Sequence, residues 1–191
     1  VPLSSKKRVG IGVASAFKNV GVGLGTIDNA GAILELTAEG KIRIYVSTVD
    51  MGQGNRTVML QMCAQKMGVS PDEIEIITGD TDLVLKAIGV AGERATYCSG
   101  NAVVRAAGEF KRRLLAQISR EVNIPSKDLD IKKNDVIDRK RGDDLVISFH
   151  EVAHLLASRG EKIRVECNYT APRTYPISFE GIPESGTASA R

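Results

Sequence analysis

A long amphipathic helix is the feature of this sequence that most constrains its fold. From Ser99 to about Val122, apolar side chains recur every three or four residues, and Arg and Lys occupy positions between them. Ser99 is the candidate N-cap, because its hydroxyl can accept a hydrogen bond from the first turn. One face of this helix is predicted to be buried, and it carries Val103, Ala107, Phe110, Leu114 and Ile118.

Strand-like runs occur on both sides of this helix. They span residues 32–36, 41–49, 73–78, 129–138, 144–147 and 162–168. The first two runs are predicted to form a hairpin through residues 38–40, which contain Gly40. The fourth and fifth are predicted to form a second hairpin around residues 140–142.

Two shorter helices are also predicted. One follows Gly54 and ends at Gly68, and the other runs from Ser148, a candidate N-cap, to Arg159. The apolar face of the first carries Met59, Met62, Cys63 and Met67. Because strands and helices interleave, the predicted fold class is α+β, or mixed α/β. We expect one unit or two small lobes, at about 1–122 and 123–182, and a flexible tail at 183–191.

Charge and composition argue against several classes of function. The chain has 26 Lys and Arg against 23 Asp and Glu, a net charge of +3, and 4% aromatic residues. Nucleic-acid binding usually needs a stronger basic excess and stacking side chains. No segment approaches the roughly 20 apolar residues of a membrane span. We therefore expect a cytoplasmic protein whose partners include neither nucleic acid nor membrane.

The ends and the cysteines add two expectations. The chain begins with Val1 rather than Met, and residues 183–191 are rich in Gly, Ser and Ala. A segment of a longer chain is therefore expected. The three cysteines lie far apart without a C-x-x-C pair, so reduced thiols are expected rather than a zinc or iron–sulfur site.

A glycine turn follows the second strand-like run. Residues 49–54 read Val-Asp-Met-Gly-Gln-Gly and lead into a predicted helix. Gly52 and Gly54 allow positive φ and a close approach of backbone N–H groups to an anion at the helix N-terminus. The amide of Gln53 is both donor and acceptor, which suits a polar heterocycle or a phosphate oxygen. Alternatively, the glycines serve only a tight strand-to-helix connection.

A second glycine-bearing loop precedes the long helix. Residues 91–102 read Ala-Gly-Glu-Arg-Ala-Thr-Tyr-Cys-Ser-Gly-Asn-Ala. Loop amides, the hydroxyl of Thr96 or Ser99, and the positive helix end could hold a further part of one extended anionic ligand. The alternative is a capped helix start in which Ser99 bonds only its own helix.

Several linked motifs resemble one family. They are Phe17-Lys-Asn-Val-Gly21, Asp50-Met-Gly-Gln-Gly54, Gly79-Asp-Thr81, and Gly92-x-Arg-x-Thr-Tyr97 followed by Ser99-Gly-Asn-Ala102. In order and spacing, over roughly residues 8–175, they resemble the molybdopterin-binding subunits of the xanthine dehydrogenase and aldehyde oxidase family. The resemblance implies one cofactor-binding part of a larger molybdenum hydroxylase subunit.

The resemblance also implies a cofactor and its contacts. Family members bind molybdopterin, or its cytosine dinucleotide form, and hydroxylate an aromatic heterocycle or an aldehyde. Many relatives carry a small hydroxyl residue where this chain has Glu93. No direct metal ligand is implied in this chain. The implied cofactor contacts are Gly52, Gln53, Gly54, Gly92, Glu93, Arg94, Ala95 and Thr96.

Other parts must supply the remaining chemistry that the resemblance implies. The family's general base is a glutamate in a Gly-rich stretch near the subunit's C-terminus, and this chain has no matching segment. No catalytic residue is therefore expected here, and the isolated chain should be inactive. The implied partners are the remaining molybdopterin-binding domain and iron–sulfur and FAD domains or subunits, together with a small-molecule substrate.

A competing motif gives the alternatives. Residues His150-Glu-Val-Ala-His154 spell H-E-x-x-H on a predicted helix, as in zinc proteases. Catalytic zinc needs a third protein ligand, and the sequence has no other histidine. A zinc hydrolase using His150, Glu151 and His154 is the alternative enzyme. The non-enzyme alternative is a scaffold piece that self-associates through exposed apolar surface.

Overall fold

The computed structural model describes residues 8–16, 26–172, 174–175 and 187–188. Within these residues strands and helices interleave, which confirms the predicted α+β class. The elements are β1 (Asn29–Leu36), β2 (Ile42–Val46), α1 (Asn55–Met67), η1 (Pro71–Glu73), β3 (Ile74–Thr78), η2 (Ala95–Ser99), α2 (Gly100–Val122), η3 (Ser126–Asp128), β4 (Leu129–Lys132), β5 (Asp135–Asp138), η4 (Arg139–Arg141), β6 (Asp144–Ser148), α3 (Phe149–Ser158), β7 (Arg164–Thr170), β8 (Thr174–Tyr175) and β9 (Thr187–Ala188).

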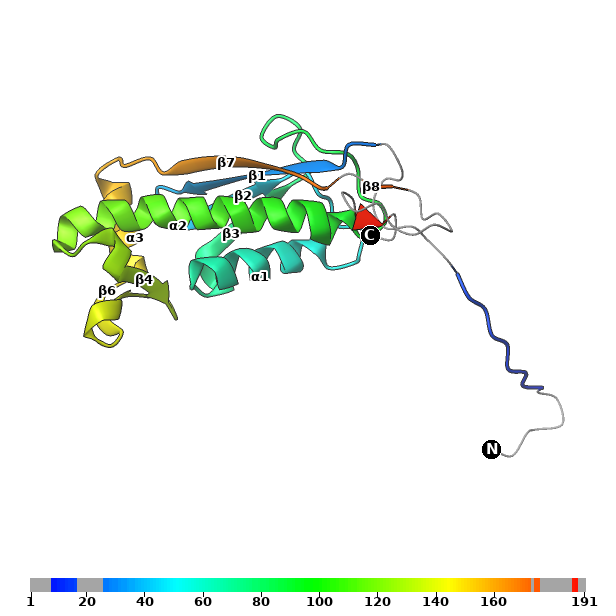
Figure 1. Cartoon of the computed structure of the whole chain (residues 1–191), viewed down its shortest axis with the longest axis horizontal. Helices are drawn as coiled ribbons and strands as arrows, with labels where there is room; N and C mark the ends of the chain where they lie inside the picture. Colours follow the sequence, from blue (N-terminus) through cyan, green and yellow to red (C-terminus); the bar gives the residue numbers. More distant parts are fainter. Residues whose placement is uncertain (1–7, 17–25, 173, 176–186, 189–191) are drawn as a thin grey trace.

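A four-stranded sheet covered by two helices forms the larger part of the structure (Figure 1). Its strand order is β3-β2-β1-β7, with β2 and β3 parallel and the other neighbours antiparallel. The β1–β2 hairpin confirms the predicted turn at residues 38–40. The parallel pair needs a crossover connection, which contains α1. Helices α1 and α2 lie side by side on one face of the sheet, with their N-termini at the same end.

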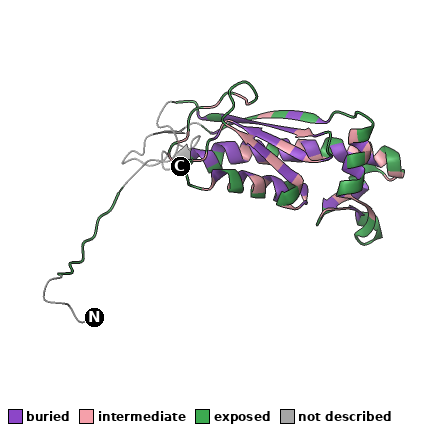
Figure 2. Cartoon of the chain, turned by 180° about the vertical axis from the view of Figure 1, so that it is seen from behind, coloured by how far each residue is buried: buried purple, intermediate pink, exposed green. Residues whose placement is uncertain are grey.

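The core lies between this sheet and the two helices (Figure 2). All five residues predicted for the inner face of α2 are fully buried: Val103, Ala107, Phe110, Leu114 and Ile118. Burial of one such large apolar side chain contributes roughly 1.5–3 kcal/mol, so this layer is the main source of hydrophobic stabilisation. No helix in the described part of the chain is long and apolar enough to cross a bilayer.

A second, three-stranded antiparallel sheet has the order β4-β5-β6 and lies with α3 between α2 and β7 in the chain. Helix α3 begins with the predicted cap, since the Ser148 hydroxyl accepts the Glu151 N–H at 3.2 Å. Strand β7 then returns to pair with β1. A lobe spanning 123–182 would therefore include a strand of the large sheet. The division into lobes stays a prediction.

Gly68 is the joint between the two sheets. It caps α1 with a φ of 86°, and a Cβ at this position would lie 1.9 Å from the carbonyl oxygen of Ile131 in β4. The N–H of Asn134 donates to the Gly68 carbonyl at 3.1 Å. Only glycine combines this conformation with so close an approach. The small sheet therefore docks directly on the C-terminus of α1.

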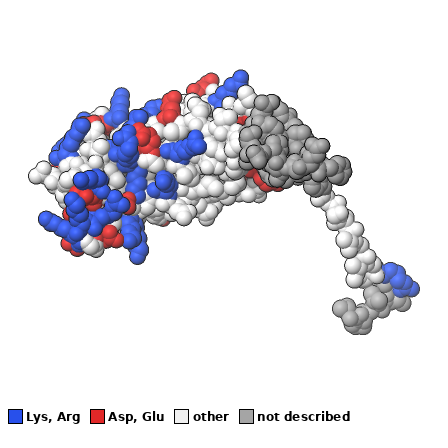
Figure 3. Space-filling view, viewed as in Figure 1, with Lys and Arg blue, Asp and Glu red and all other residues white. Residues whose placement is uncertain are grey.

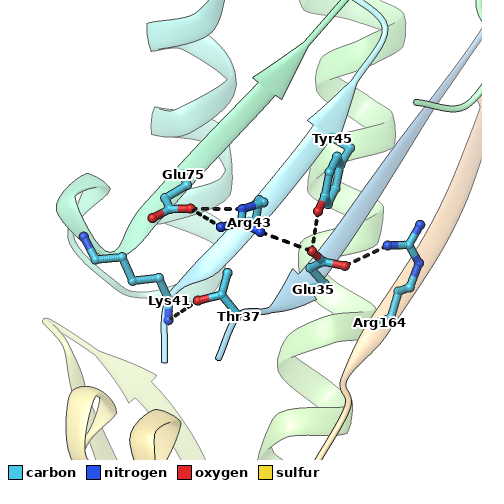
Figure 4. A network of polar contacts seen from close by, with 7 residues as sticks. All are labelled: Glu35, Thr37, Lys41, Arg43, Tyr45, Glu75 and Arg164. Carbon is cyan, nitrogen blue, oxygen red and sulfur yellow. Dashed lines mark hydrogen bonds and ion pairs between the residues drawn. The ribbon is translucent and has the colours of Figure 1, made fainter. Parts of the chain in front are cut away.

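The sheet face away from α1 and α2 carries a ladder of alternating charges (Figure 4). Glu75, Arg43, Glu35 and Arg164 follow one another on β3, β2, β1 and β7 and are paired in register. Arg43 Nη2 lies 2.8 Å from Glu75, and Arg164 Nη1 lies 2.7 Å from Glu35. Each cross-strand pair contributes roughly 0.2–1 kcal/mol. The ladder therefore supports strand register more than overall stability.

Two local predictions are wrong. Ser99 does not cap α2, because the π-helical turn η2 runs straight into it and gives Ser99 helical backbone angles. Residues 129–138 are not one strand, because Lys133 and Asn134 adopt positive φ and form a turn between β4 and β5. The second hairpin, β5–β6, is confirmed around residues 139–143. The motif at residues 17–21 and all of the tail except residues 187–188 lie outside the described residues.

Candidate functional site

Two strand-to-helix connections meet at one end of the large sheet. Residues 47–54 lead from β2 into α1, and residues 79–94 lead from β3 into η2 and α2. Because β2 and β3 are parallel, their C-terminal ends lie at the same end of the sheet, and both connections begin there. The N-termini of α1 and η2 lie at this end of the sheet, where the helix dipoles place partial positive charge. The fold thus brings together the two segments singled out in the sequence.

The turn before α1 is stabilised by hydrogen bonds to the carboxylate of Asp50, which belongs to the same turn. Asp50 Oδ1 accepts the N–H groups of Gly52 at 2.9 Å and Gly54 at 3.3 Å, and Oδ2 accepts that of Arg56 at 3.1 Å. The bonds from Arg56 and Gly52 lower the pKa of Asp50. The anion at these amides is therefore an internal one. An Asp two positions before a glycine, which is typical of an Asx turn, was the signal for the first of these bonds.

The amides of Gln53 and Asn55 are held by the same turn. Gln53 Oε1 accepts the Met51 N–H at 2.6 Å, and its Nε2 donates to the Val49 carbonyl at 3.2 Å. Asn55 Nδ2 donates to the same carbonyl at 3.3 Å, and Asn55 is buried. Both amides are therefore oriented by the protein before any ligand binds.

Arg94 is buried in the protein interior. Its side chain has no exposed surface, and Nε donates to Asp28 Oδ1 at 2.7 Å. Nη1 donates to the carbonyls of Ile88 and Gly89, and Nη2 donates to that of Asn29. The guanidinium therefore ties the loop before η2 to the start of β1. The geometry gives it a role in positioning this loop and does not support side-chain contact with a ligand.

Further contacts hold the same loop and the adjoining turn η2. A Cβ at Gly31 would lie 2.6 Å from Leu85 Cβ, so glycine lets the loop pack against β1. The hydroxyls of Thr48 and Ser99 lie 2.6 Å apart and join the end of β2 to η2. The loop is therefore fixed from both β1 and β2.

A cavity of about 730 Å³ lies between the two connections. This volume falls within the roughly 300–1,000 Å³ of small-molecule sites. Its walls are mostly apolar, with the amides of Gln53 and Asn55 and the hydroxyl of Thr96 as polar groups. Among these described lining residues, Glu93 alone is charged. The lining consists of Met51, Gln53, Asn55, Val58, Val90, Ala91, Gly92, Glu93, Ala95 and Thr96.

Most of the predicted contact residues meet at this cavity. Five line it, namely Gln53, Gly92, Glu93, Ala95 and Thr96. Gly52 and Gly54 form the turn that holds Asp50, and Arg94 lies in the interior. The five lining residues that were not predicted as contacts are Met51, Asn55, Val58, Val90 and Ala91. Of these, Asn55 and Val58 could have been found, because their spacing of three in the first turns of α1 places them on one side.

The H-E-x-x-H segment lies on α3, at the other end of the molecule (Figure 1). The rings of His150 and His154 are 4.4 Å apart between centroids, and both residues are exposed. The Glu151 carboxylate accepts the Ser148 hydroxyl at 2.6 Å and so caps its own helix. Among the described residues, no group of three His, Cys, Asp or Glu could hold a metal ion. Within this motif, Glu151 therefore serves as part of the helix cap.

Solved structures define the class of fold. The chain aligns with the Cu,Mo-CO dehydrogenase at a TM-score of 0.65 and 20% identity, covering 81% of this chain and 20% of that one. It aligns with quinoline 2-oxidoreductase from Pseudomonas putida 86 at a TM-score of 0.62 and 23% identity, covering 76% and 19%. At such low identity these matches show a shared fold.

The family follows from the sequence comparison. The chain belongs to the molybdopterin cofactor-binding domain family, whose model matches residues 3–188, and this confirms the resemblance seen in the motifs. A protein named "Probable hypoxanthine oxidase" from Escherichia coli K12 is 28% identical over 153 residues, which are 80% of this chain. The 6-hydroxypseudooxynicotine dehydrogenase complex subunit gamma of Paenarthrobacter nicotinovorans is 29% identical over 143 residues, or 71%. The chain spans only 16% and 18% of these two relatives.

Proposed function

We propose that the cavity between residues 51–58 and 90–96 receives the pterin part of molybdopterin, within a molybdenum hydroxylase. The observation that carries this proposal is the convergence of Gln53 with Gly92, Glu93, Ala95 and Thr96 on one cavity. Family membership supplies the identity of the cofactor. The two connections, far apart in sequence, act here as the two walls of one site.

The lining groups fit an uncharged heterocycle better than a phosphate. The apolar walls can contact the flat faces of a ring, and the oriented amides of Gln53 and Asn55 match ring N–H and carbonyl groups. The Glu93 carboxylate can accept N–H donors of a pterin, whereas it would repel a phosphate. Asp50 already occupies the amides of the glycine turn. The phosphate of molybdopterin therefore extends out of the cavity, and so does the cytosine nucleotide when the dinucleotide form is bound.

The chain's own contribution is binding and orientation. The bound molybdenum cofactor would supply hydroxylation of an aromatic heterocycle or an aldehyde. The complete enzyme would also need a general base from the remaining molybdopterin-binding domain. It would pass electrons to acceptors on iron–sulfur and FAD partners. The chain by itself is then inactive.

Metal and pterin analysis tests the proposal. The protein, purified from a host that makes molybdopterin, should contain molybdenum and pterin in equal amounts. Gln53→Ala removes the proposed hydrogen bonds to the pterin, which contribute about 1 kcal/mol to binding. The molybdenum and pterin contents should therefore both fall about fivefold. The control His150→Ala should match the unmodified protein. Stoichiometric zinc that disappears in His150→Ala, without molybdenum, would support the zinc hydrolase instead.

A further inference from the structure

A basic groove lies at the end of the molecule away from the candidate site, where Lys and Arg gather on the surface in Figure 3. Two cavities, of about 810 and 380 Å³, share Lys111, Asp130 and Arg139 and so form one groove. It runs from the C-terminal half of α1 along α2 to β4 and η4. We define the basic groove by its charged lining residues: Lys66, Lys111, Arg112, Lys132, Lys133, Arg139, Asp130 and Asp143.

The groove concentrates positive charge. Six of its charged residues are cationic and two are anionic, an excess of four, whereas the net charge of the whole chain is +3. Both acids are already paired, Asp130 with Lys111 at 2.6 Å and Asp143 with Lys132 at 2.8 Å. A local excess of this kind attracts anionic partners and speeds their association.

Three cations remain available to a partner. Lys66, Lys133 and Arg139 are exposed, and none of them takes part in an ion pair among the described residues. Arg139 Nη2 donates to the Lys127 carbonyl at 2.8 Å, which leaves its other guanidinium donors.

The groove is built on fixed contacts. Lys111 Nζ donates to the Ile131 carbonyl at 3.1 Å and joins α2 to β4 beneath the exposed cations. Gly68 gives the close approach of β4 to α1, and a Cβ at Gly108 would lie 3.1 Å from Lys66 Cε. A preformed groove lowers the entropic cost of binding.

The remaining lining residues indicate the kind of partner. The apolar residues that line the groove are almost fully buried beneath the cations, and no aromatic residue lines the groove to stack on a base. A peptide rich in carboxylates is complementary to the exposed cations Lys66, Lys133 and Arg139. We propose that the basic groove binds an acidic segment of a protein partner. The apolar lining residues are Ala64, Val69, Leu115, Leu129, Ile131 and Ile137.

A labelled peptide tests this proposal independently of the cofactor. The probe is a fluorescein-labelled twelve-residue peptide with three repeats of Glu-Leu-Glu-Glu, and its binding is followed by anisotropy at low and physiological salt. Lys66→Gln, Lys133→Gln and Arg139→Gln together should weaken binding about tenfold and flatten its salt dependence. The matched control combines Lys86→Gln, Arg120→Gln and Lys162→Gln, which removes the same charge elsewhere, and should stay within about twofold.

Three results would overturn the proposal. An equal loss in both triple variants would mean that overall charge, and not the groove, attracts the peptide. Absence of peptide binding at low salt would show that the basic groove does not bind acidic segments. Tighter, groove-dependent binding of a short DNA duplex than of the peptide would assign the groove to nucleic acid. Circular dichroism of each variant ensures that all of them are compared as folded proteins.

Discussion

Each end of this molecule contains a glycine at a close contact and an ion pair, but the ion pair is buried at one end and exposed at the other. A glycine permits a close approach at each end, Gly31 beneath Leu85 at the candidate site and Gly68 against Ile131 at the basic groove. At the site end, the pair Arg94–Asp28 is almost completely buried. At the groove end, pairs such as Lys132–Asp143 are largely exposed.

This difference separates a structural role of charge from a surface role. A buried guanidinium must keep all its partners, because an unpaired charge in the interior is strongly destabilising. It therefore fixes one position for the loop that lines the cavity. Exposed pairs contribute roughly 0–1 kcal/mol and leave side chains free to meet a partner. Buried charge thus holds the loop at the site end in place, whereas the groove end presents charge to its surroundings.

The largest expected effect comes from breaking the buried pair. Arg94→Met should lower the free energy of unfolding by about 3–5 kcal/mol, because Asp28 and three carbonyls lose their donor. The matched change Arg112→Met removes an exposed partner of Glu109 and should lower it by about 1 kcal/mol or less. Urea denaturation measures both. Equal effects would contradict the distinction between the two ends.

The second-largest loss of stability is expected where Gly68 closely approaches β4. Gly68→Ala combines left-handed strain with a Cβ placed 1.9 Å from the Ile131 carbonyl, and should destabilise by about 3 kcal/mol. Gly142→Ala has a similar φ of 76° with nothing within 4 Å, and should lose only about 1 kcal/mol. Thermal unfolding compares the two. If both variants lose the same stability, strain alone explains Gly68.

A pH-dependent effect is expected at the glycine turn. The pKa of Asp50 is lowered in the folded protein, so its carboxylate stabilises the fold above the ordinary Asp pKa. This contribution is lost as the pH falls through the folded-state pKa. Asp50→Asn should therefore unfold at a lower temperature at neutral pH, and the gap should narrow as the pH falls below the ordinary Asp pKa. A gap that is independent of pH would mean that the charge of Asp50 does not matter.

The smallest effect belongs to an exposed pair of the groove. A double-mutant cycle with Lys132→Ala and Asp143→Ala should give a coupling energy of about 0.5 kcal/mol or less. Urea denaturation at high salt should reduce it further, because salt screens exposed charges. A coupling above about 2 kcal/mol would place this pair in the same class as Arg94–Asp28.

Local patterns predicted the elements, while contacts between distant residues decided the site. The buried face of α2 and the Ser148 cap depend on neighbours within a few positions, and both predictions are confirmed. Arg94 was an implied cofactor contact, and the sequence did not show its burial because its partner Asp28 lies 66 positions away. Ser99 resembled a cap because its partner Thr48 lies 51 positions away. Tertiary partners of this kind leave no local pattern to read.

The cavity also combines local patterns with distant contacts. The two glycine-bearing segments were recognisable, and the parallel β2–β3 pair places them together. That Asp50 would occupy the turn amides depended on the loop geometry, since its carboxylate reaches residues two, four and six positions onward. The sequence therefore indicated two walls of the cavity, and the structure gave the lining groups on which the proposal of a pterin ligand rests.

The cofactor content of Ala91→Trp tests the central claim most directly. Ala91 is exposed and lines the cavity, so an indole here should fill the space proposed for the pterin without disturbing the core. Ala38→Trp places the same side chain on the exposed β1–β2 turn as a control. Molybdenum and pterin should fall about tenfold or more in Ala91→Trp and stay unchanged in Ala38→Trp. Full cofactor content in a folded Ala91→Trp protein would show that the cofactor binds elsewhere.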